Sequence, residues 1–433
     1  MASARRLATI VLAAVVAADV AIAACAQPGD RMPSAPTSTS TGVPAVAPST
    51  GSTPNRSALP ATTPPTLPSD GGPTASVTGR ADRITLAFAG DVHFERGLSR
   101  LVTSPEPLTA AVRDTLGRAD FAMVNLETAV GEGGAPLPGK KYTFRAPVAA
   151  LTTLAAAGVD AVSMANNHAA DFGDAVFAQT LDARRAAPLP VVGIGRDEAH
   201  AFAPLQLDVR GVRVAVLASS QIRDVTAAQH AAGPTSPGIA TNLEPGRLLA
   251  AVRRARATSD LVVVMLHWGA DYTRCADGAQ RETARLLADA GADVIVGGHA
   301  HRPQGSGWLA PGGRASHGRP GPATNPATNP AANTATTSAP NPAFVAYGLG
   351  NFVWYNNQDA AAESGVLTLT VDASAARDAT RRTGPVVVDQ HWTPMLIGDD
   401  GVPRVPTSAA TGARLAGAWD TATQCAGLED QPG

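Results

Sequence analysis

The residues best suited to chemistry are histidines that follow short apolar runs. Residues 293–301 read DVIVGGHAH, so three aliphatic side chains are followed by two glycines and then by His299 and His301. A short aliphatic run that stops at Gly-Gly predicts a buried parallel strand that ends in a loop. Open α/β sheets bind ligands at that edge, and Gly297 and Gly298, which lack Cβ, let the backbone approach a neighbour closely. Taken alone, two nearby histidines are better explained as surface residues.

The same arrangement recurs along the chain. Five of the nine histidines lie at or just beyond the ends of four predicted strands, together with two carboxylates and an amide. Imidazole and carboxylate groups suit Zn, Mn or Fe, and a purely structural site would usually be a closed Cys/His tetrahedron. Two divalent ions about 3.5–4 Å apart can activate a water and hold an oxyanion. The sequence therefore predicts a site for two divalent metal ions of unknown identity, with ligands drawn from Asp91, His93, Glu127, Asn167, His168, His267, His299 and His301.

Alternating strands and helices must position these residues. Apolar runs predict strands at 84–90, 121–127, 159–164, 189–194, 261–266, 294–296, 344–354, 365–371 and 386–391, and a pair of alternating strands turns at Arg210-Gly211. Helical spacing predicts helices at 108–116, 148–157, 174–187, 245–257 and 277–290. The order strand, polar tip, helix predicts a layered α/β fold with a mostly parallel sheet and its polar groups on one edge.

The amino terminus is predicted to be a targeting segment. Arg5 and Arg6 precede an apolar stretch at 7–18 that is too short to span a bilayer alone. The stretch ends in Ile-Ala-Ala-Cys at 22–25, which resembles a bacterial lipobox. We therefore expect residues 1–25 to be a signal peptide ending at a lipidated Cys25, and the protein to be exported and anchored to the cell membrane. The alternative is an ordinary signal peptide cleaved near Ala23.

Two segments cannot contribute to a core. Residues 26–82 form a Pro/Ser/Thr-rich tether and residues 311–342 a low-complexity insertion, and such compositions predict disorder. The folded domain is expected at 83–398, with a C-terminal tail at 399–433. Cys275 and Cys425 could form a disulfide, but the sequence does not decide this. A formal net charge of −2 gives no reason to expect nucleic acid as a partner.

The chain from 84 to about 354 resembles the CapA family of capsule-synthesis (poly-gamma-glutamate) proteins, a branch of the calcineurin-like metallophosphoesterases. The resemblance implies a four-layer α/β/β/α sandwich. It rests on six motifs, of which the first five occur in the family's order: GDVH at 90–93, NLE at 125–127, ANNHAADFG at 165–173, HWG at 267–269, GGHAH at 297–301 and GLGNF at 348–352.

The resemblance also implies roles for individual residues. Asp91, His93 and His301 would hold one metal, and Asn167, His267 and His299 the other, with Glu127 as the bridge. His168 would be the acid that protonates a leaving oxygen, and Asp171 would orient its ring. Two departures stand against ordinary phosphoesterase activity, namely Asn125-Leu126-Glu127 in place of Gly-Asp and Ala169 in place of an acidic residue. A Glu reaches one methylene further than an Asp, which changes the expected spacing between the metals.

Two classes of function follow from these residues. In the first, the protein is a surface-anchored metal-dependent hydrolase or transferase that acts on an envelope polymer or on its phosphorylated precursor. In the second, it belongs to a membrane complex for polymer synthesis or export and binds anionic carboxylates without chemistry. Both classes make an anionic envelope polymer the expected partner.

Overall fold

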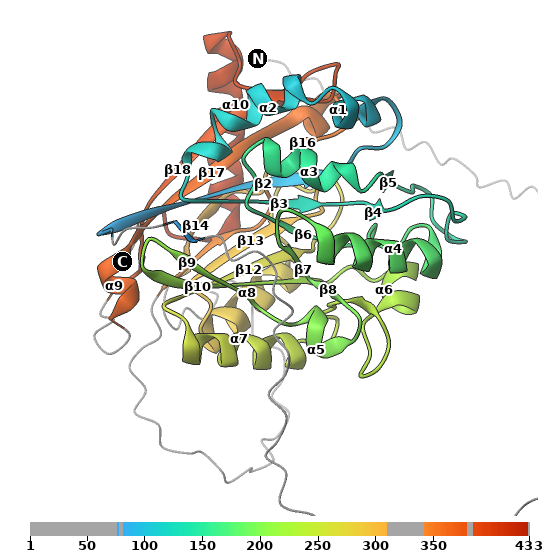
Figure 1. Ribbon diagram of the computed structural model, residues 1–433. Helices are drawn as coiled ribbons and strands as arrows, with labels where there is room; N and C mark the ends of the chain where they lie inside the picture. Colours follow the sequence, from blue (N-terminus) through green and yellow to red (C-terminus); the bar gives the residue numbers. More distant parts are fainter. Residues whose placement is uncertain (1–75, 78–80, 310–341, 379–383, 432–433) are drawn as a thin grey trace, which may run out of the picture. The chain divides into compact units, whose positions relative to one another are not determined.

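The computed structural model describes residues 76–77, 81–309, 342–378 and 384–431 (Figure 1). The expected signal peptide (1–25), the tether up to residue 75 and residues 311–341 of the insertion lie outside the described residues, as does Cys25. The described residues belong to one compact unit. Within the described ranges, no helix combines the length and the apolarity that a membrane span requires.

The first sheet has eight strands and carries half of the predicted site. Its order is β19-β18-β17-β2-β3-β6-β7, and β16 pairs with β2 in parallel. The strands β2, β3, β6 and β7 are parallel neighbours, whereas β17 and β18 add antiparallel strands on the other side of β2. The bounds are β2 (Arg83–Val92), β3 (Phe121–Leu126), β6 (Ala161–Ser163), β7 (Val191–Val192), β16 (Asn351–Val353), β17 (Glu363–Asp372), β18 (Val387–Ile397) and β19 (Pro403–Arg404).

The second sheet has seven strands in the order β1-β9-β10-β12-β13-β15-β14. Its central strands β10, β12, β13 and β15 are parallel. The predicted turn at Arg210-Gly211 is confirmed, because β9 and β10 pair antiparallel around these two residues of positive φ. The bounds are β1 (Ser76–Val77), β9 (Leu205–Val209), β10 (Val212–Ser220), β12 (Leu261–His267), β13 (Val294–Gly298), β14 (Ser306–Leu309) and β15 (Ala343–Ala346).

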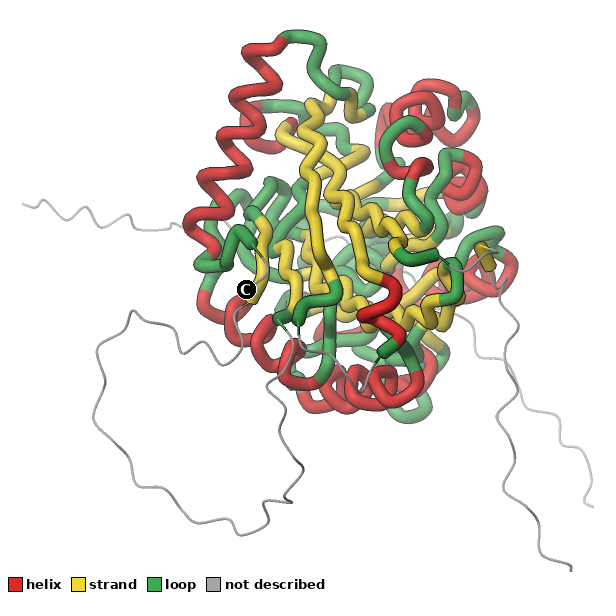
Figure 2. Tube along the Cα trace, turned by 90° about the vertical axis from the view of Figure 1, so that its left-hand side faces the viewer, coloured by secondary structure: helices red, strands yellow, loops and turns green. Residues whose placement is uncertain are grey.

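The two sheets pack face to face, and helices cover their outer faces. Phe88 of β2 and Met265 of β12 belong to one buried apolar cluster between the sheets. Full burial of such a side chain stabilises the fold by about 1.5–3 kcal/mol. A second cluster packs α2 (Glu106–Arg113), α3 (Ala149–Ala156) and α4 (Gly173–Ala186) on the first sheet, and a third packs α7 (Gly246–Thr258) and α8 (Gly278–Ala290) on the second. Figure 2 shows the strands between these helices, and the predicted α/β class is confirmed.

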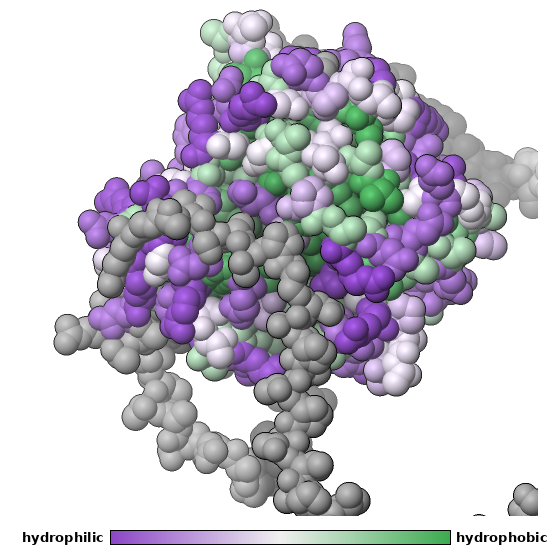
Figure 3. Space-filling view, in the orientation of Figure 1, coloured by the Kyte–Doolittle hydropathy of each residue, from purple (hydrophilic) through white to green (hydrophobic). Residues whose placement is uncertain are grey.

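Short elements complete the described chain. They are α1 (Arg100–Thr103), α5 (Glu198–Ala201), α6 (Val225–His230), α9 (Ala373–Arg377), β4 (Ala129–Val130), β5 (Arg145–Ala146), β8 (Ile194–Gly195) and β11 (Gly238–Ile239). On the face shown in Figure 3, hydrophilic side chains alternate with apolar ones, which show mainly in its upper half. Scattered apolar residues are normal on a protein surface.

The strand predicted at 344–354 is wrong as a single element. Its first part is β15 of the second sheet and its last part is β16 of the first sheet. Gly350, with a φ of +74°, lies between them, so the chain turns there and crosses from one sheet to the other. A Cβ on Gly90 would lie 1.8 Å from the Gly350 carbonyl oxygen, which explains why a glycine precedes Asp91. The strand predicted at 189–194 is likewise divided into β7 and β8.

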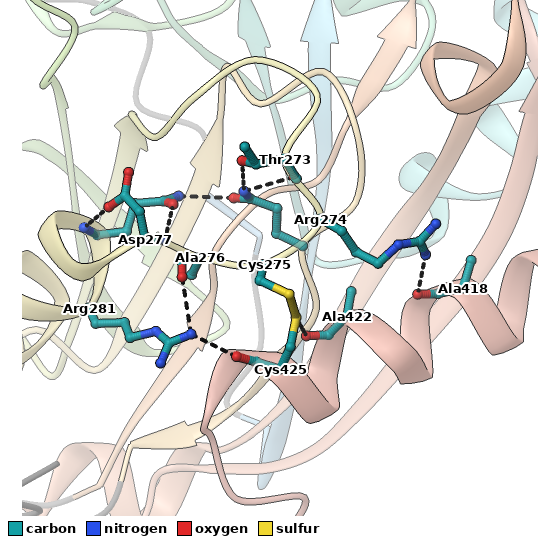
Figure 4. Close-up of a disulfide and its surroundings, with 11 residues drawn as sticks. Thr273, Arg274, Cys275, Ala276, Asp277, Arg281, Ala418, Ala422 and Cys425 are labelled. Carbon is teal, nitrogen blue, oxygen red and sulfur yellow. Dashed lines mark hydrogen bonds between the residues drawn. A yellow bond between two sulfur atoms is a disulfide. The ribbon is translucent and has the colours of Figure 1, made fainter. Parts of the chain in front are cut away.

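Residues 399–433, expected to be a tail, contribute β19 and the long helix α10 (Ala409–Ala426) to the described structure. The helix packs on β18, where Trp419 stacks on Trp392 with ring centroids 3.9 Å apart. Its end is joined covalently to the loop after β12, because Cys275 and Cys425 form a disulfide with Cα atoms 5.6 Å apart (Figure 4). The pairing that the sequence left open is therefore present.

Candidate metal centre

Both sheets bring their parallel strand ends to one place. Asp91 lies near the end of β2, and Glu127 directly follows β3. From the second sheet, His267 is the last residue of β12, while His299 and His301 follow β13. The register places Asp91 opposite Asn125, and His267 opposite Gly298. The centre is therefore assembled from chain segments that are far apart in sequence, as predicted.

Glu127 occupies the middle of the cluster. Its side chain is fully buried, and neither carboxylate oxygen has a hydrogen-bond partner among the described residues. Burial and the nearby charge of Asp91 raise the pKa of Glu127 well above its ordinary value. Potential ligand atoms of Glu127, His267 and His299 lie within 4.8 Å of one another. The same holds for a second group, formed by Glu127, Asp91 and His301. A buried carboxylate without hydrogen bonds is costly unless a cation is bound, so these residues fit a site for divalent metal around Glu127.

His267 is oriented by amide groups. Its Nδ1 lies 3.1 Å from Asn125 Nδ2, and its Nε2 lies 2.8 Å from Asn167 Oδ1 and 3.2 Å from Glu127 Oε1. Burial lowers the pKa of His267 to about 4, so the ring is neutral at neutral pH. A neutral imidazole is the form that binds metals. Asn167 Oδ1 and Glu127 Oε1 therefore both lie close to Nε2 of His267, so these three predicted ligands come together.

Asp91 links the two sheets. Its Oδ1 accepts from Asn125 Nδ2 at 2.8 Å, and its Oδ2 accepts from the backbone N–H of His299 at 3.0 Å. Burial acts to raise the pKa of Asp91, but the hydrogen bond from His301 and nearby histidine charges lower it to about 2. A Cβ on Gly298 would lie 2.4 Å from Asp91 Oδ1, so this glycine does allow the close approach that the sequence predicted.

His301 lies between a carboxylate and an amide. Its Nδ1 is 3.5 Å from Asp91 Oδ2 and 2.9 Å from Asn351 Oδ1. Burial opposes protonation of this ring, but the charges of Glu127 and Asp91 outweigh it and raise the pKa of His301 to about 9. Asn351 belongs to the GLGNF segment and is not a member of the groups of potential ligand atoms. Its contact with Nδ1 orients the His301 ring.

His93 lies beside the cluster but belongs to none of the ligand groups found in the described part of the chain. Its ring stacks on Phe144 at 4.5 Å between centroids and packs edge-on against Trp354 at 4.2 Å. Its Nδ1 accepts the backbone N–H of Glu95 at 3.1 Å, and its buried Nε2 has no hydrogen-bond partner among the described atoms. The role predicted for His93 in the first metal site stays a prediction.

His168 is held by a buried charge network. Its Nδ1 lies 2.6 Å from Asp171 Oδ2, and its Nε2 lies 3.7 Å from Glu127 Oε1. The Lys140 ammonium group lies 3.0 Å from Asp171 and 2.9 Å from Asp224, and it also donates to the Asn167 carbonyl oxygen. Burial raises the pKa of Asp171 to about 7 although Lys140 opposes this, and burial together with Lys140 lowers the pKa of His168 well below its ordinary value.

A cavity of about 600 Å³ opens beside these residues. Its rim combines cations and aromatic rings, and the Arg96 guanidinium lies 4.6 Å from the Tyr355 ring centroid. Tyr142 and Tyr272 are 50% and 48% exposed. Besides His168, His299 and His301, the cavity is lined by Arg96, Lys140, Lys141, Tyr142, Tyr272 and Tyr355, and by the carboxylates of Asp224 and Asp271. An anionic ligand could therefore reach the centre from solvent.

Three polar residues of the site were not predicted. Asn125 lies in the NLE motif, in which only Glu127 was predicted to be a ligand. Lys140 belongs to a loop without any recognisable pattern. Asp271 forms a third group of potential ligand atoms with His299 and His301. Its position four residues after His267, in HWGAD, is the only signal in the sequence that could have identified it.

The comparison with known families matches this region. The model for "Bacterial capsule synthesis protein PGA_cap" matches residues 85–356, which is more than half of the chain. The chain belongs to the PGA_cap family. The match includes every residue of the candidate metal centre from Asp91 to His301, so the resemblance to capsule-synthesis proteins is confirmed.

Curated relatives carry matching names. The chain is 28% identical over 229 residues to the capsule biosynthesis protein CapA of Bacillus anthracis, covering 51% of this chain and 55% of that protein. It is 27% identical over 224 residues to the PGA biosynthesis protein CapA of Bacillus subtilis strain 168, covering 51% and 58%. The chain thus spans somewhat more than half the length of these PGA_cap relatives. A hypothetical protein from Thermus thermophilus aligns in structure with 18% identity and a TM-score of 0.35, covering 74% of this chain and 96% of that chain.

Proposed function

We propose that this PGA_cap protein is a metal-dependent hydrolase of capsule, poly-gamma-glutamate or related envelope-polymer metabolism. The carrying observation is the buried Glu127, which belongs to two groups of potential ligand atoms and whose carboxylate oxygens accept no hydrogen bond from the described residues. The names of the relatives, which concern capsule and PGA biosynthesis, support the substrate class. The substrate would be an anionic polymer or its phosphorylated precursor.

Two ions, of Mn, Zn or Fe, would be held by the predicted residues. One would take Asp91, His93 and His301, and the other Asn167, His267 and His299, with Glu127 between them. The donor set of imidazole and carboxylate groups suits these metals. When bound, such a pair activates water and neutralises charge on an oxyanion. The layered sheets and the position of the site at strand ends support the metallophosphoesterase type of fold that the resemblance implies.

His168 would move the proton. With its Nδ1–H donated to Asp171, the Nε2 atom faces the Glu127 side of the cavity. An anionic substrate beside Nε2 favours the protonated ring, because an opposite charge raises the pKa of an imidazole. The proton can then be donated from Nε2 to a leaving oxygen. Lys140 keeps the Asp171 carboxylate in place during this transfer.

The test is turnover by the full chain loaded with Mn or Zn. A generic phosphodiester and polyglutamate are offered to the wild type, to His168→Ala and to His391→Ala, a control in which an exposed histidine of β18 is removed. We expect His168→Ala to lose about 10²–10⁴-fold in turnover, while His391→Ala keeps it. Equal turnover in all three proteins would refute the proposed role of His168.

The cationic and aromatic rim of the cavity supports a second candidate function. A protein that only holds an anionic polymer in a synthesis or export complex would need the Arg96 and Lys141 side chains but no proton transfer. Polyglutamate would then bind to the wild type and to His168→Ala alike, without turnover. Binding would weaken in Arg96→Ala combined with Lys141→Ala.

We also propose that the protein works outside the cytoplasm, anchored by a lipid on Cys25. The support is the lipobox-like sequence at 22–25 together with the disulfide, a bond typical of oxidising compartments. A Cys25→Ala variant should leave the membrane fraction. A variant that stays in this fraction like the wild type would speak against the anchor.

A further inference from the structure

Asp271 touches the candidate metal centre from the solvent side. Its Oδ1 lies 3.2 Å from His299 Nε2, and its side chain is 59% exposed, whereas that of His299 is 11% exposed. The carboxylate therefore caps the outer nitrogen of a ring whose other parts point into the protein.

The inner nitrogen of His299 lacks a hydrogen-bond partner among the described residues. Nδ1 is buried and makes no hydrogen bond to any described residue. A neutral imidazole carries a proton on one nitrogen and a lone pair on the other. A carboxylate can accept but not donate a hydrogen bond, so the Asp271 oxygen 3.2 Å from Nε2 favours the tautomer with its proton on that nitrogen. The lone pair is thus left on Nδ1.

The loop that carries Asp271 is fixed on both sides. The backbone N–H of Tyr272 donates to the Ala300 carbonyl at 2.8 Å, and Tyr272 has a φ of +59°, which is unusual for a residue with a side chain. Three residues further on, the disulfide at Cys275 joins the loop to α10 (Figure 4). Asp271 is consequently held against His299 by the backbone, although its side chain is exposed.

We propose that Asp271 is a positioning residue for His299, which fixes the ring with its proton on Nε2 and leaves Nδ1 as the atom that would bind a metal ion together with Glu127 and His267. The proposal rests on the metal centre of the proposed function. Carboxylates that accept a hydrogen bond from a metal-binding histidine fix its tautomer and raise its basicity, and their loss typically costs 10–100-fold in metal affinity. No other residue of the described structure contacts His299 Nε2 in the same way.

Metal titration of the full chain after chelation tests the proposal. We expect Asp271→Ala to bind one of two Mn²⁺ or Zn²⁺ ions about 10–100-fold more weakly than the wild type in calorimetry, with unchanged stoichiometry. Asp271→Glu should restore part of the affinity. The matched control is Asp174→Ala, since Asp174 Oδ1 lies 3.1 Å from His230 Nε2 and the His230 Nδ1 atom is also buried without a hydrogen-bond partner in the described structure. This control should bind both ions normally.

Wild-type affinity in Asp271→Ala would overturn the proposal. Loss of a whole ion, as in His299→Ala, would overturn it too, because Asp271 would then be a direct ligand. The tautomer is read independently by long-range ¹H–¹⁵N correlation of the imidazole rings in metal-free protein. In the wild type, the His299 ring should carry its proton on Nε2. In Asp271→Ala, the ring should be a mixture of the two neutral tautomers. A proton on Nδ1 in the wild type would contradict the proposal. These measurements do not depend on turnover, so a failure of the hydrolase proposal is distinguished from a failure of this one.

Discussion

The His168 imidazole and the Asp171 carboxylate share a hydrogen bond of 2.6 Å between Nδ1 and Oδ2. The same Oδ2 accepts the backbone N–H of Phe144 at 2.8 Å, and Lys140 contacts the other oxygen at 3.0 Å. The carboxylate is therefore fixed on three sides and has one orientation available. This arrangement directs Nε2 of His168 towards Glu127.

We expect Asp171→Asn to lower turnover by about 10²-fold, within the range seen when an acid–base group is lost. The neutral amide can donate to Nδ1, which would place the ring proton on Nε2 in the free protein and remove the charge that stabilises a protonated ring. Turnover is measured with the metal-loaded protein. Because Asp171 belongs to no ligand group among the described residues, elemental analysis should find the wild-type metal content, and a loss of metal would contradict a role limited to His168.

Substitutions of Glu127 and of His267 should differ in the number of metal ions whose binding they weaken. Glu127 lies in two ligand groups and His267 in one. We therefore expect Glu127→Gln to weaken both ions and His267→Ala to weaken one, as measured by elemental analysis after dialysis. His391→Ala is the control and should keep both. The bridging role of Glu127 would be refuted if Glu127→Gln retained one ion at wild-type affinity.

The disulfide between Cys275 and Cys425 closes a loop with a sequence separation of 150 residues. We expect Cys275→Ala combined with Cys425→Ala to lower the free energy of unfolding by about 2–4 kcal/mol, measured by denaturant titration. A reducing agent should lower the stability of the wild type to that of the variant and leave the variant unchanged. Equal stability of the variant and the oxidised wild type would show that the bond is not needed.

Asp260 offers a test of stability against pH away from the metal centre. Its carboxylate accepts hydrogen bonds from Arg213, at 2.6 Å from Nη2 and at 2.9 Å from the backbone nitrogen. Burial acts to raise the pKa of Asp260, but these hydrogen bonds outweigh it and lower the pKa below its ordinary value. A carboxyl group whose pKa is lower in the folded state stabilises the fold above its unfolded pKa, and this contribution disappears as the pH falls through the folded pKa.

Asp260→Asn should therefore lower the free energy of unfolding by about 1.5–3 kcal/mol at pH 7. The difference from the wild type should shrink progressively below about pH 4. Urea titrations at pH 7, 5 and 3.5 measure it. The control is Asp182→Asn, because the Asp182–Arg185 pair is 69% and 67% exposed and such pairs contribute only about 0–1 kcal/mol. A difference that stayed constant with pH would refute the ionic explanation.

The elements that position the site were predictable because their strands are unbroken apolar runs. Strand β12 spans Leu261–His267, and the sequence predicted it at 261–266. Burial on both faces requires such runs, and the histidines that follow them lie at the same edge in the structure. The local pattern could not show that the strands belong to two sheets, since parallel strands alternate with helices in both. Only the family resemblance implied a second sheet.

The rest of the site depends on contacts between distant loops. Lys140 precedes Asp171 by 31 residues in the sequence. Only folding brings its ammonium group into contact with the Asp171 carboxylate. Asp271 is a single carboxylate on a loop, with no periodicity to distinguish it from a solvated residue. The crossing at Gly350 was missed because its left-handed backbone conformation leaves no mark on the hydrophobic pattern.

The donors of the candidate metal centre come from both halves of the sandwich, with Asp91 and Glu127 on one sheet and His267 and His299 on the other. An ion that takes ligands from both sheets adds a link across their interface, and its binding free energy then adds to that of folding. Metal supply during growth would in that case govern how long the protein survives proteolysis, whether or not a substrate is present. Cells starved of the ion would then lose the protein itself as well as its activity.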